Sequence, residues 1–388
     1  MSPGRESILF ARNLFLPKDL GGNRYPYETM RRLGARGHPV TVVTPRLHGD
    51  FPALAGVGYR LFPVQRPHPV ISHLTNLLGA TLALRTVPKH DVAIAGSYDA
   101  ALALGWARVV PRTPLVFLFH SELYSEWVQS RAVARQVLRR YMAALEQRVF
   151  GLSARIIAVS EFSARQIRAR APRAGNNVRI LATGVETDFF RPPVSKVLAR
   201  AEVGLKSEEP LVLGVGRLAG VKQFDRLITA FTVASARGLK ARLAIAGDGP
   251  ERPKLEQLIA TYGMGDRIDL AGYCDPPRLR SYMQAADLQV CSSAFENLSL
   301  AILEGMACGT PVLGTPGGGT PEPVGAIDPA LVLEDDHVHT LADALPGWLG
   351  DGERLAELGQ RARQLAVDRY DWERVVDGLE AVCSEVTA

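Results

Sequence analysis

Short apolar runs alternate along this chain with longer segments in which apolar and polar residues recur at helical spacing. The short runs are bounded by Gly, Pro or polar residues, as strands usually are. In the first half they lie at Ile8–Ala11, Val40–Thr44, Val92–Ala95, Leu115–Phe119 and Arg155–Val159. In the second half they lie at Leu211–Val215, Arg242–Ala246, Ile268–Leu270, Leu288–Cys291 and Val312–Gly314. Helical patterns lie between them, for example at Tyr27–Arg36, Arg131–Val149, Phe224–Ala236 and Leu298–Ala307.

Strands that alternate with helices form parallel sheets that are covered on both faces. The 388 residues exceed the roughly 250–300 residues at which a single hydrophobic core stops growing. We therefore predict an α/β fold with two Rossmann-like, doubly wound domains, 1–190 and 191–370, each binding ligands at the carboxyl ends of its strands. The boundary is placed at Phe189–Pro193, where a Pro pair stops regular structure. The last helix, 371–388, is expected to pack back onto the first domain.

Charge is distributed unevenly between the two halves. Residues 1–195 contain 26 Lys and Arg against 12 Asp and Glu, and the remaining residues contain 19 against 28. The net charge of +5 therefore conceals a basic half and an acidic half. This asymmetry indicates that the two halves meet different partners.

The four cysteines all lie beyond residue 273, and none forms a Cys-x-x-Cys pair. This spacing argues against a disulfide framework and against a structural zinc site. The chain has no apolar run of the about 20 residues that cross a membrane, and its first residues lack the apolar core of a signal peptide. We therefore expect a cytoplasmic protein.

Two carboxylates stand out in the segment Ser292–Met306, which follows a predicted strand and opens a helix. The free N–H groups of a helix N-terminus suit a diphosphate or sugar oxygens. Glu304 follows Glu296 by eight residues, a little over two helical turns, so the pair can bind two hydroxyl-bearing groups of one extended ligand. The alternative is that Glu296 is a favourable charge at a helix start and Glu304 is exposed to solvent.

A glycine-rich turn, Gly214–Leu218, ends another predicted strand. The turn contains one cation, Arg217, and a second cation, Lys222, follows shortly after it. One Arg guanidinium can donate to two phosphate oxygens at once, and Lys adds a compact positive charge. The turn is neither a Walker motif nor the full dinucleotide fingerprint. The first Gly-rich turn, Pro17–Gly22, also lacks that fingerprint, which disfavours a Rossmann dehydrogenase.

Three further features allow two interpretations each. Gly247–Pro250 is a tight turn after a strand, and it can also border a nucleotide. Gly21 and Gly22 either let the backbone approach a ligand closely or form a flexible loop. His120, at the carboxyl end of a predicted strand, either points into the ligand crevice or is structural.

In this order, these segments resemble the family 4 retaining glycosyltransferases of the GT-B fold, over nearly the whole chain. The glutamate pair, Glu296 and Glu304, is the most specific part of the resemblance. The other matching segments are Gly21-Gly22, Arg36-Gly37-His38-Pro39-Val40, His120, Val159–Ser163, Thr183–Pro192, Gly216-Arg217-Leu218, Ala246–Pro250, Met306–Val312 and Gly318–Glu322.

The resemblance implies a role for each matching residue at a cleft between the two domains. Arg217 and Lys222 would hold the donor diphosphate, Glu304 the ribose hydroxyls, and Glu296 the hydroxyls of the donor sugar. His120 would face the sugar from the other domain. Glu296, His120, Arg217 and Lys222 would thus be the catalytic group. The donor-binding residues would be Gly22, Gly216, Arg217, Lys222, Gly247, Asn297, Leu298, Ser299, Leu300 and Glu304.

The resemblance also implies metal-independent transfer of a hexose from a UDP- or GDP-sugar to a hydroxyl acceptor, with no cofactor and no nucleic-acid partner. Arg217, Lys222 and the helix N-terminus can replace Mg²⁺ in stabilising the departing diphosphate. A nucleotide-sugar epimerase or a glucan or sucrose synthase of the same fold is an alternative, as is a binding protein that no longer transfers sugar.

The sequence departs from the family at three places. The usual Glu-Gly-Phe-Gly is replaced by Glu296-Asn297-Leu298-Ser299, which leaves the donor sugar open. The usual Lys-Gly is Lys222-Gln223. The usual Glu-Ala-Met is Glu304-Gly305-Met306, where a glycine inside a helix costs about 1 kcal/mol but admits close packing.

In this fold the first domain usually binds the acceptor, and here that domain is basic. Arg131, Arg135 and Arg139 are four residues apart and share one face of a predicted helix. A basic amphipathic helix can lie on an anionic membrane. We therefore expect an acceptor that is anionic or is presented at the inner membrane surface. It would be a sugar, a lipid-linked sugar or a small molecule. The alternative is a solvated arginine-rich face.

Overall fold

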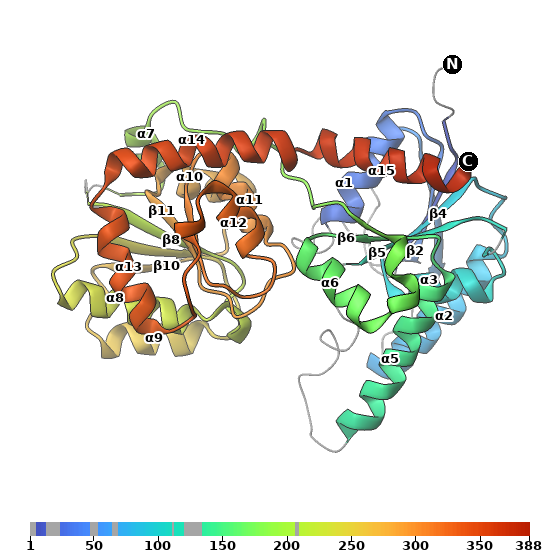
Figure 1. The fold of residues 1–388 in the computed structure, drawn as a ribbon, viewed down its shortest axis with the longest axis horizontal. Helices are drawn as coiled ribbons and strands as arrows, with labels where there is room; N and C mark the ends of the chain where they lie inside the picture. Colours follow the sequence, from blue (N-terminus) through green and yellow to red (C-terminus); the bar gives the residue numbers. More distant parts are fainter. Residues whose placement is uncertain are drawn as a thin grey trace. The chain divides into compact units, whose positions relative to one another are not determined.

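The computed structural model describes residues 5–12, 24–46, 53–63, 69–110, 112–119, 134–205 and 209–388. The chain divides into two compact units, Met1–Ala182 with Val375–Ala388, and Thr183–Arg374. Each unit is a parallel sheet with helices on both faces (Figure 1). The fold class is thus the predicted α/β class with two Rossmann-like domains.

The first unit contains a seven-stranded sheet in the order β3-β2-β1-β4-β5-β6-β7. Its central strands are fully buried because both faces are covered, so their sequences are continuous apolar runs. Its strands are β1 (Ile8–Ala11), β2 (Val40–Arg46), β3 (Val57–Pro63), β4 (Val92–Ala95), β5 (Leu115–Phe119), β6 (Arg155–Ala158) and β7 (Val178–Ile180). Its helices are α1 (Arg24–Ala35), α2 (Pro69–Leu84), α3 (Tyr98–Trp106), α5 (Ala134–Leu152), α6 (Glu161–Arg170) and the short η1 (Pro172–Asn177), together with most of α15 (Trp372–Thr387).

The second unit contains a five-stranded sheet in the order β10-β9-β8-β11-β12. Its strands are β8 (Leu211–Val215), β9 (Arg242–Ala246), β10 (Ile268–Gly272), β11 (Leu288–Cys291) and β12 (Val312–Gly314). Its helices are α7 (Lys196–Glu202), η2 (Gly220–Lys222), α8 (Phe224–Ala236), α9 (Arg252–Thr261), α10 (Pro276–Ala285), α11 (Leu300–Ala307), α12 (Pro321–Ile327), η3 (Pro329–Leu331), α13 (Val338–Leu349) and α14 (Gly352–Arg369). Apolar residues of α8, α9 and α13 form one core with the sheet.

The two strands that the apolar pattern missed are the edges of the first sheet, β3 and β7. An edge strand needs no continuous apolar run, because one side of it is open to solvent. In β3, buried or half-buried residues alternate with exposed ones, and β7 is three residues long with Ile180 exposed.

The unit boundary lies eight residues before the predicted one, between Ala182 and Thr183. The segment that precedes the Pro pair belongs to the second unit because it is bound there. Val185 forms a parallel bridge with Asp371, and the Arg363 guanidinium donates hydrogen bonds to the carbonyl oxygens of Thr187 and Phe190, at 2.8 and 3.0 Å. The Pro pair therefore ends this bound segment and does not separate the units.

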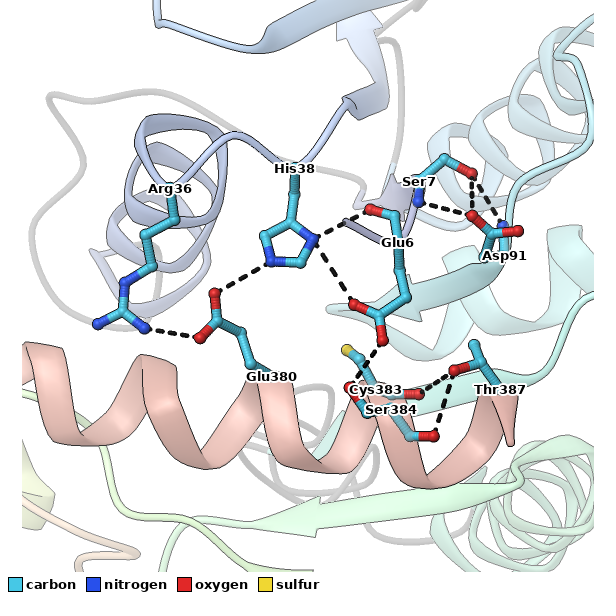
Figure 2. Close-up of polar contacts among 9 residues, drawn as sticks. All are labelled: Glu6, Ser7, Arg36, His38, Asp91, Glu380, Cys383, Ser384 and Thr387. Atoms are coloured by element: carbon cyan, nitrogen blue, oxygen red, sulfur yellow. Dashed lines mark hydrogen bonds and ion pairs between the residues drawn. The ribbon is translucent and has the colours of Figure 1, made fainter. Parts of the chain in front are cut away.

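The C-terminal residues 375–388 belong to the first unit and are bound to it by a polar cluster (Figure 2). Nε2 of His38 lies 3.0 Å from Oε1 of Glu380, and its Nδ1 lies 3.1 Å from the carbonyl oxygen of Glu6. The Arg36 guanidinium donates to both Glu380 and Asp377 at 2.7 Å. Arg36 and His38 belong to a segment that resembles the family, and here they anchor helix α15.

Candidate active site

The predicted donor-site residues gather where the strand order of the second sheet reverses. Strands β8 and β11 are neighbours, Val212 opposite Leu288 and Gly214 opposite Val290. In doubly wound sheets, ligands bind beyond the carboxyl ends of the strands at this reversal. The loop after β8 carries Arg217 and Lys222, and the loop after β11 carries Glu296.

Lys222 and Glu296, 74 residues apart in sequence, form an ion pair across this point. The Nζ of Lys222 donates to Oε1 of Glu296, and Oγ of Ser293 donates to the same oxygen at 2.8 Å. The two charged side chains are 19% and 15% exposed, so water screens the pair only in part. Both described partners bind Oε1, which leaves Oε2 of the carboxylate to accept from a ligand hydroxyl.

Two hydrogen bonds to backbone carbonyl oxygens hold the two loops together next to the ion pair. The Ala294 N–H donates to the carbonyl oxygen of Val221 at 2.9 Å. Oγ of Ser292 donates to the carbonyl oxygen of Lys222 at 2.8 Å. The position of the ion pair is therefore set by the backbone and does not depend on two flexible side chains alone.

Arg217 is exposed, and its guanidinium forms no hydrogen bond or ion pair with any residue that the structure describes. It follows Gly216 directly at the end of β8. Its guanidinium therefore keeps all five N–H donors for an anionic ligand, and phosphate is the group that such a fork binds best.

Gly247 is explained first by packing. Its φ is +152°, and a Cβ there would lie 1.8 Å from the carbonyl oxygen of Gly216. Its N–H donates to the carbonyl oxygen of Gly272 at 2.8 Å. The tight-turn interpretation therefore holds, and the turn packs directly against the glycine that precedes Arg217.

Helix α11 begins at Leu300, two residues later than predicted, with Ser299 as its N-cap. Glu296 consequently lies in the loop before the helix, and Asn297 and Leu298 form a bend between them. The reason is a tertiary contact: the N–H of Gly319 donates to the carbonyl oxygen of Glu296 at 2.7 Å. The estimate of two helical turns between the two glutamates was therefore wrong.

The N-terminus of α11 offers donors to a ligand. Within an α-helix the first N–H groups have no acceptor, here those of Leu300, Ala301 and Ile302. The Ser299 side chain makes no capping hydrogen bond to them. Such a terminus binds anionic oxygens.

Glu304 is 5% exposed, so the alternative of a solvent-exposed residue is wrong. It lies in the second turn of α11, one turn before Cys308. Burial raises the pKa of the Cys308 thiol, and the Glu304 charge raises that pKa further. A buried carboxylate near the donor loops fits a role in binding hydroxyl groups.

Two features support the site in ways that were not predicted from the sequence. Ser293 is one, and its position three residues before Glu296 was the available signal. The other is the glycine run 317–319, which packs against the loop that carries Glu296. Gly318 has a φ of +67°, and a Cβ there would lie 2.1 Å from the carbonyl oxygen of Glu296.

The two predicted site residues of the first half, Gly22 and His120, lie outside the residues that the structure describes. Within the described part of the chain, no group of three His, Cys, Asp or Glu side chains is arranged to hold a metal ion. No helix there is both long and apolar enough to cross a membrane.

A parallel α/β fold with cations, a carboxylate and a helix N-terminus at the strand reversal is typical of an enzyme that binds a nucleotide. Family models agree: residues 21–189 match "Glycosyltransferase Family 4", and residues 196–365 match "Glycosyl transferases group 1". The chain belongs to the family 4 glycosyltransferases of the GT-B fold, and it is a glycosyltransferase.

Known relatives cover almost the whole chain. It is 29% identical to the GDP-mannose-dependent α-(1-6)-phosphatidylinositol monomannoside mannosyltransferase of Mycobacterium tuberculosis, over 96% of both chains. It is also 29% identical to the D-inositol 3-phosphate glycosyltransferase of Thermobispora bispora, over 95% of this chain and 90% of that protein. Sucrose-phosphate synthase from Thermosynechococcus elongatus shares the fold with a TM-score of 0.83 at 22% identity, covering 98% and 99% of the two chains.

Proposed function

We propose that this glycosyltransferase transfers a hexose from a UDP- or GDP-sugar to a hydroxyl acceptor with retention of anomeric configuration and without a metal ion. The observation that carries the proposal is the Lys222–Glu296 pair beside the N-terminus of α11, with Arg217 next to it. The relatives support the kind of donor, since one is named for GDP-mannose and a structural neighbour from Anabaena, HepE, was crystallised with UDP-glucose.

Each described residue has a defined task in this proposal. Arg217 and Lys222 bind the diphosphate, and the N–H groups at the start of α11 bind its oxygens or those of the sugar. Glu304 accepts from the ribose hydroxyls. Oε2 of Glu296 accepts from a donor-sugar hydroxyl next to the reacting carbon.

The transfer step follows from these positions. The acceptor oxygen forms a bond to the anomeric carbon, and the bond from that carbon to the phosphate oxygen breaks. The acceptor proton passes to the departing phosphate oxygen on the same face of the sugar. Charge grows on the diphosphate in this step, and fixed cations and helix N–H groups stabilise such charge most effectively in a partly dry site.

The proposal is tested first by ligand binding. A ligand that binds only the native state raises the melting temperature, so UDP, GDP, ADP and their sugars can be compared in one thermal-shift panel. We expect one diphosphate and its sugars to raise it, and Glu296→Ala and Arg217→Ala each to abolish transfer. Full transfer activity in either variant would refute the site assignment. Product analysis separates transfer from epimerisation, because an epimerase releases an altered nucleotide sugar.

We further propose that the acceptor is anionic or lipid-linked and is bound by the basic first unit. The mannosyltransferase relative is named for a phosphatidylinositol acceptor. Helices α2, α3 and α5, which pack in that order, expose large apolar side chains: Leu82 at 62%, Trp106 at 53% and Tyr141 at 58%. Arg140 beside Tyr141 is exposed as well, whereas the side chains of Arg131, Arg135 and Arg139 lie outside the described part. Exposed aromatic rings with cations suit an anionic lipid surface.

Liposome co-sedimentation tests this second proposal. We expect the protein to sediment with anionic vesicles and to remain in solution with neutral ones, and Trp106→Ala to reduce sedimentation. Equal recovery with both kinds of vesicle would refute it.

A further inference from the structure

A glutamine lies where the second sheet is otherwise apolar. Gln289 is in the middle of β11, between β8 and β12, and it is 2% exposed. Its neighbours along the strand, Leu288 and Val290, belong to the core beneath α8, so Gln289 points to the opposite face, toward α11. A buried amide in a central parallel strand needs a physical reason, because it must find hydrogen-bond partners there.

The glutamine side chain is bound to the helix that carries the donor site. Its Nε2 donates to the carbonyl oxygen of Ala301 at 2.9 Å, and Ala301 is the second residue of α11. Its Oε1 is buried with no hydrogen-bond partner among the described residues. A buried acceptor without a partner costs free energy, so its retention calls for an explanation.

The same oxygen explains the glycine in Glu304-Gly305-Met306. A Cβ on Gly305 would lie 2.0 Å from Oε1 of Gln289 and 3.0 Å from its Cδ. The amide therefore occupies the volume that any larger residue at 305 would need. The glutamine and the glycine form a complementary pair, in which the amide of Gln289 disfavours a side chain at 305.

A small cavity borders the buried glutamine. The cavity next to the pair, lined by Gln289, Ser292, Ser299 and Ile302 among others, measures about 10 Å³. This is at the lower limit of the space that a single water molecule requires. A side chain at 305 would have to displace the Gln289 amide or shift helix α11.

We propose that Gln289 and Gly305 form an interlock that seats helix α11 on strand β11, and that Gln289 is thereby a positioning residue for donor binding. Seating the helix fixes the N–H groups of Leu300 to Ile302 and the carboxylate of Glu304, which lies between the two contacts of the interlock along the helix. The Gln289 bond to the Ala301 carbonyl also polarises the peptide that ends in the Ile302 N–H, which makes that N–H a stronger donor to an anionic ligand. This inference rests on the proposed function.

A cycle of variants tests the interlock with the full-length protein. Gly305→Ala introduces the clash, Gln289→Met removes the hydrogen bond but keeps the bulk, and Gln289→Ala with Gly305→Ala removes the clash again. Gly325→Ala is the matched control, since that glycine of α12 has ordinary contact distances around a Cβ, the nearest atom being 3.5 Å away. The measured quantities are the Kd for UDP and GDP by calorimetry, the donor KM and kcat, and the melting temperature.

We expect Gly305→Ala to raise the nucleotide Kd and the donor KM about ten-fold or more and to lower the melting temperature, although alanine is the better helix former. The double variant should recover part of the melting temperature that Gly305→Ala loses, but its Kd should stay at least as high as that of Gln289→Met, because both variants lack the hydrogen bond to Ala301. Gln289→Met should raise Kd with little change in melting temperature, and Gly325→Ala should change neither.

The outcomes separate this inference from the proposed function. If all variants keep the Kd of the unaltered protein, or if affinity falls only in proportion to melting temperature, the positioning role is wrong. If the double variant melts no higher than Gly305→Ala, the interlock is wrong. If the unaltered protein binds neither UDP nor GDP, the proposed function fails.

Discussion

Removing the charge of Lys222 is the most direct test of how the donor site works. In Lys222→Met, Glu296 loses its cation but keeps the hydrogen bond from Ser293 at 2.8 Å. The two side chains are 19% and 15% exposed. Their burial is intermediate between that of fully exposed ion pairs, which are worth about 0–1 kcal/mol, and that of buried pairs, whose disruption costs about 3–5 kcal/mol. We therefore expect a loss of about 1–2 kcal/mol in the free energy of unfolding.

The effect on catalysis should be larger than the effect on stability. In the proposed function, the Lys222 charge acts on the departing diphosphate, where the loss of one stabilising donor costs about 2.7–4 kcal/mol in the transition state. We expect kcat/KM to fall by about 10²–10³. Initial rates at varied donor concentration, followed by release of the nucleoside diphosphate, give this quantity, and urea unfolding gives the stability.

The matched control is Lys254→Met. Lys254 also pairs with carboxylates, Asp225 at 3.0 Å and Glu251 at 3.3 Å, but its side chain is 60% exposed on helix α9. This variant should keep kcat/KM within about two-fold, as expected for a solvent-screened pair that touches no ligand. A Lys222→Met enzyme whose kcat/KM stays within about three-fold of the unaltered protein would refute the assigned role.

Two further predictions concern stability. Arg155 and Arg179 bind Glu385 and lower the pKa of its carboxyl to about 2. Because the pKa in the folded state lies below that in the unfolded state, the ionised carboxylate stabilises the fold above about pH 4.5. This stabilisation is lost as the pH falls toward 2. Glu385→Gln should therefore lower the urea midpoint near neutral pH and have little effect near pH 2, and an equal effect at both values would contradict the reasoning. Gly247→Ala places a Cβ 1.8 Å from the Gly216 carbonyl oxygen and should cost about 2–5 kcal/mol in urea unfolding. Gly263→Ala, at a φ of +65° with open space around it, should cost only about 1–2 kcal/mol, and equal losses would show that the close contact at 247 is not the cause.

Most of the sheet could be predicted from the sequence because its strands are buried on both faces. Such strands, for example Leu115–Phe119, are continuous apolar runs that are too short to be helices. The edge strands β3 and β7 were not predicted, because pairing with a neighbouring strand, and not their own composition, makes them strands. The start of α11 was misplaced for a similar reason, since Gly319 binds the carbonyl oxygen of Glu296 from a distant part of the chain.

The site divides in the same way. The residue types were readable from the sequence, because cations and carboxylates that follow buried strands collect at the carboxyl edge of a parallel sheet. The sequence did not predict which of these residues contact one another. Lys222 and Glu296 are 74 residues apart, and only the pairing of β8 with β11 brings them together. Spacing also left open whether Glu304 was exposed, and only packing around α11 decided that it is buried.

By itself, therefore, the sequence determined the alternation of strands and helices, the two-domain α/β class and the chemical groups of the donor site. Those properties depend on local burial patterns and on residues at strand ends. The tertiary structure alone decided which groups touch and which glycines are required by close contact. Gly305 shows the difference: its sequence marks it only as an unfavourable helix residue, and the reason for it is the amide of Gln289 packed 2.0 Å from where its side chain would begin.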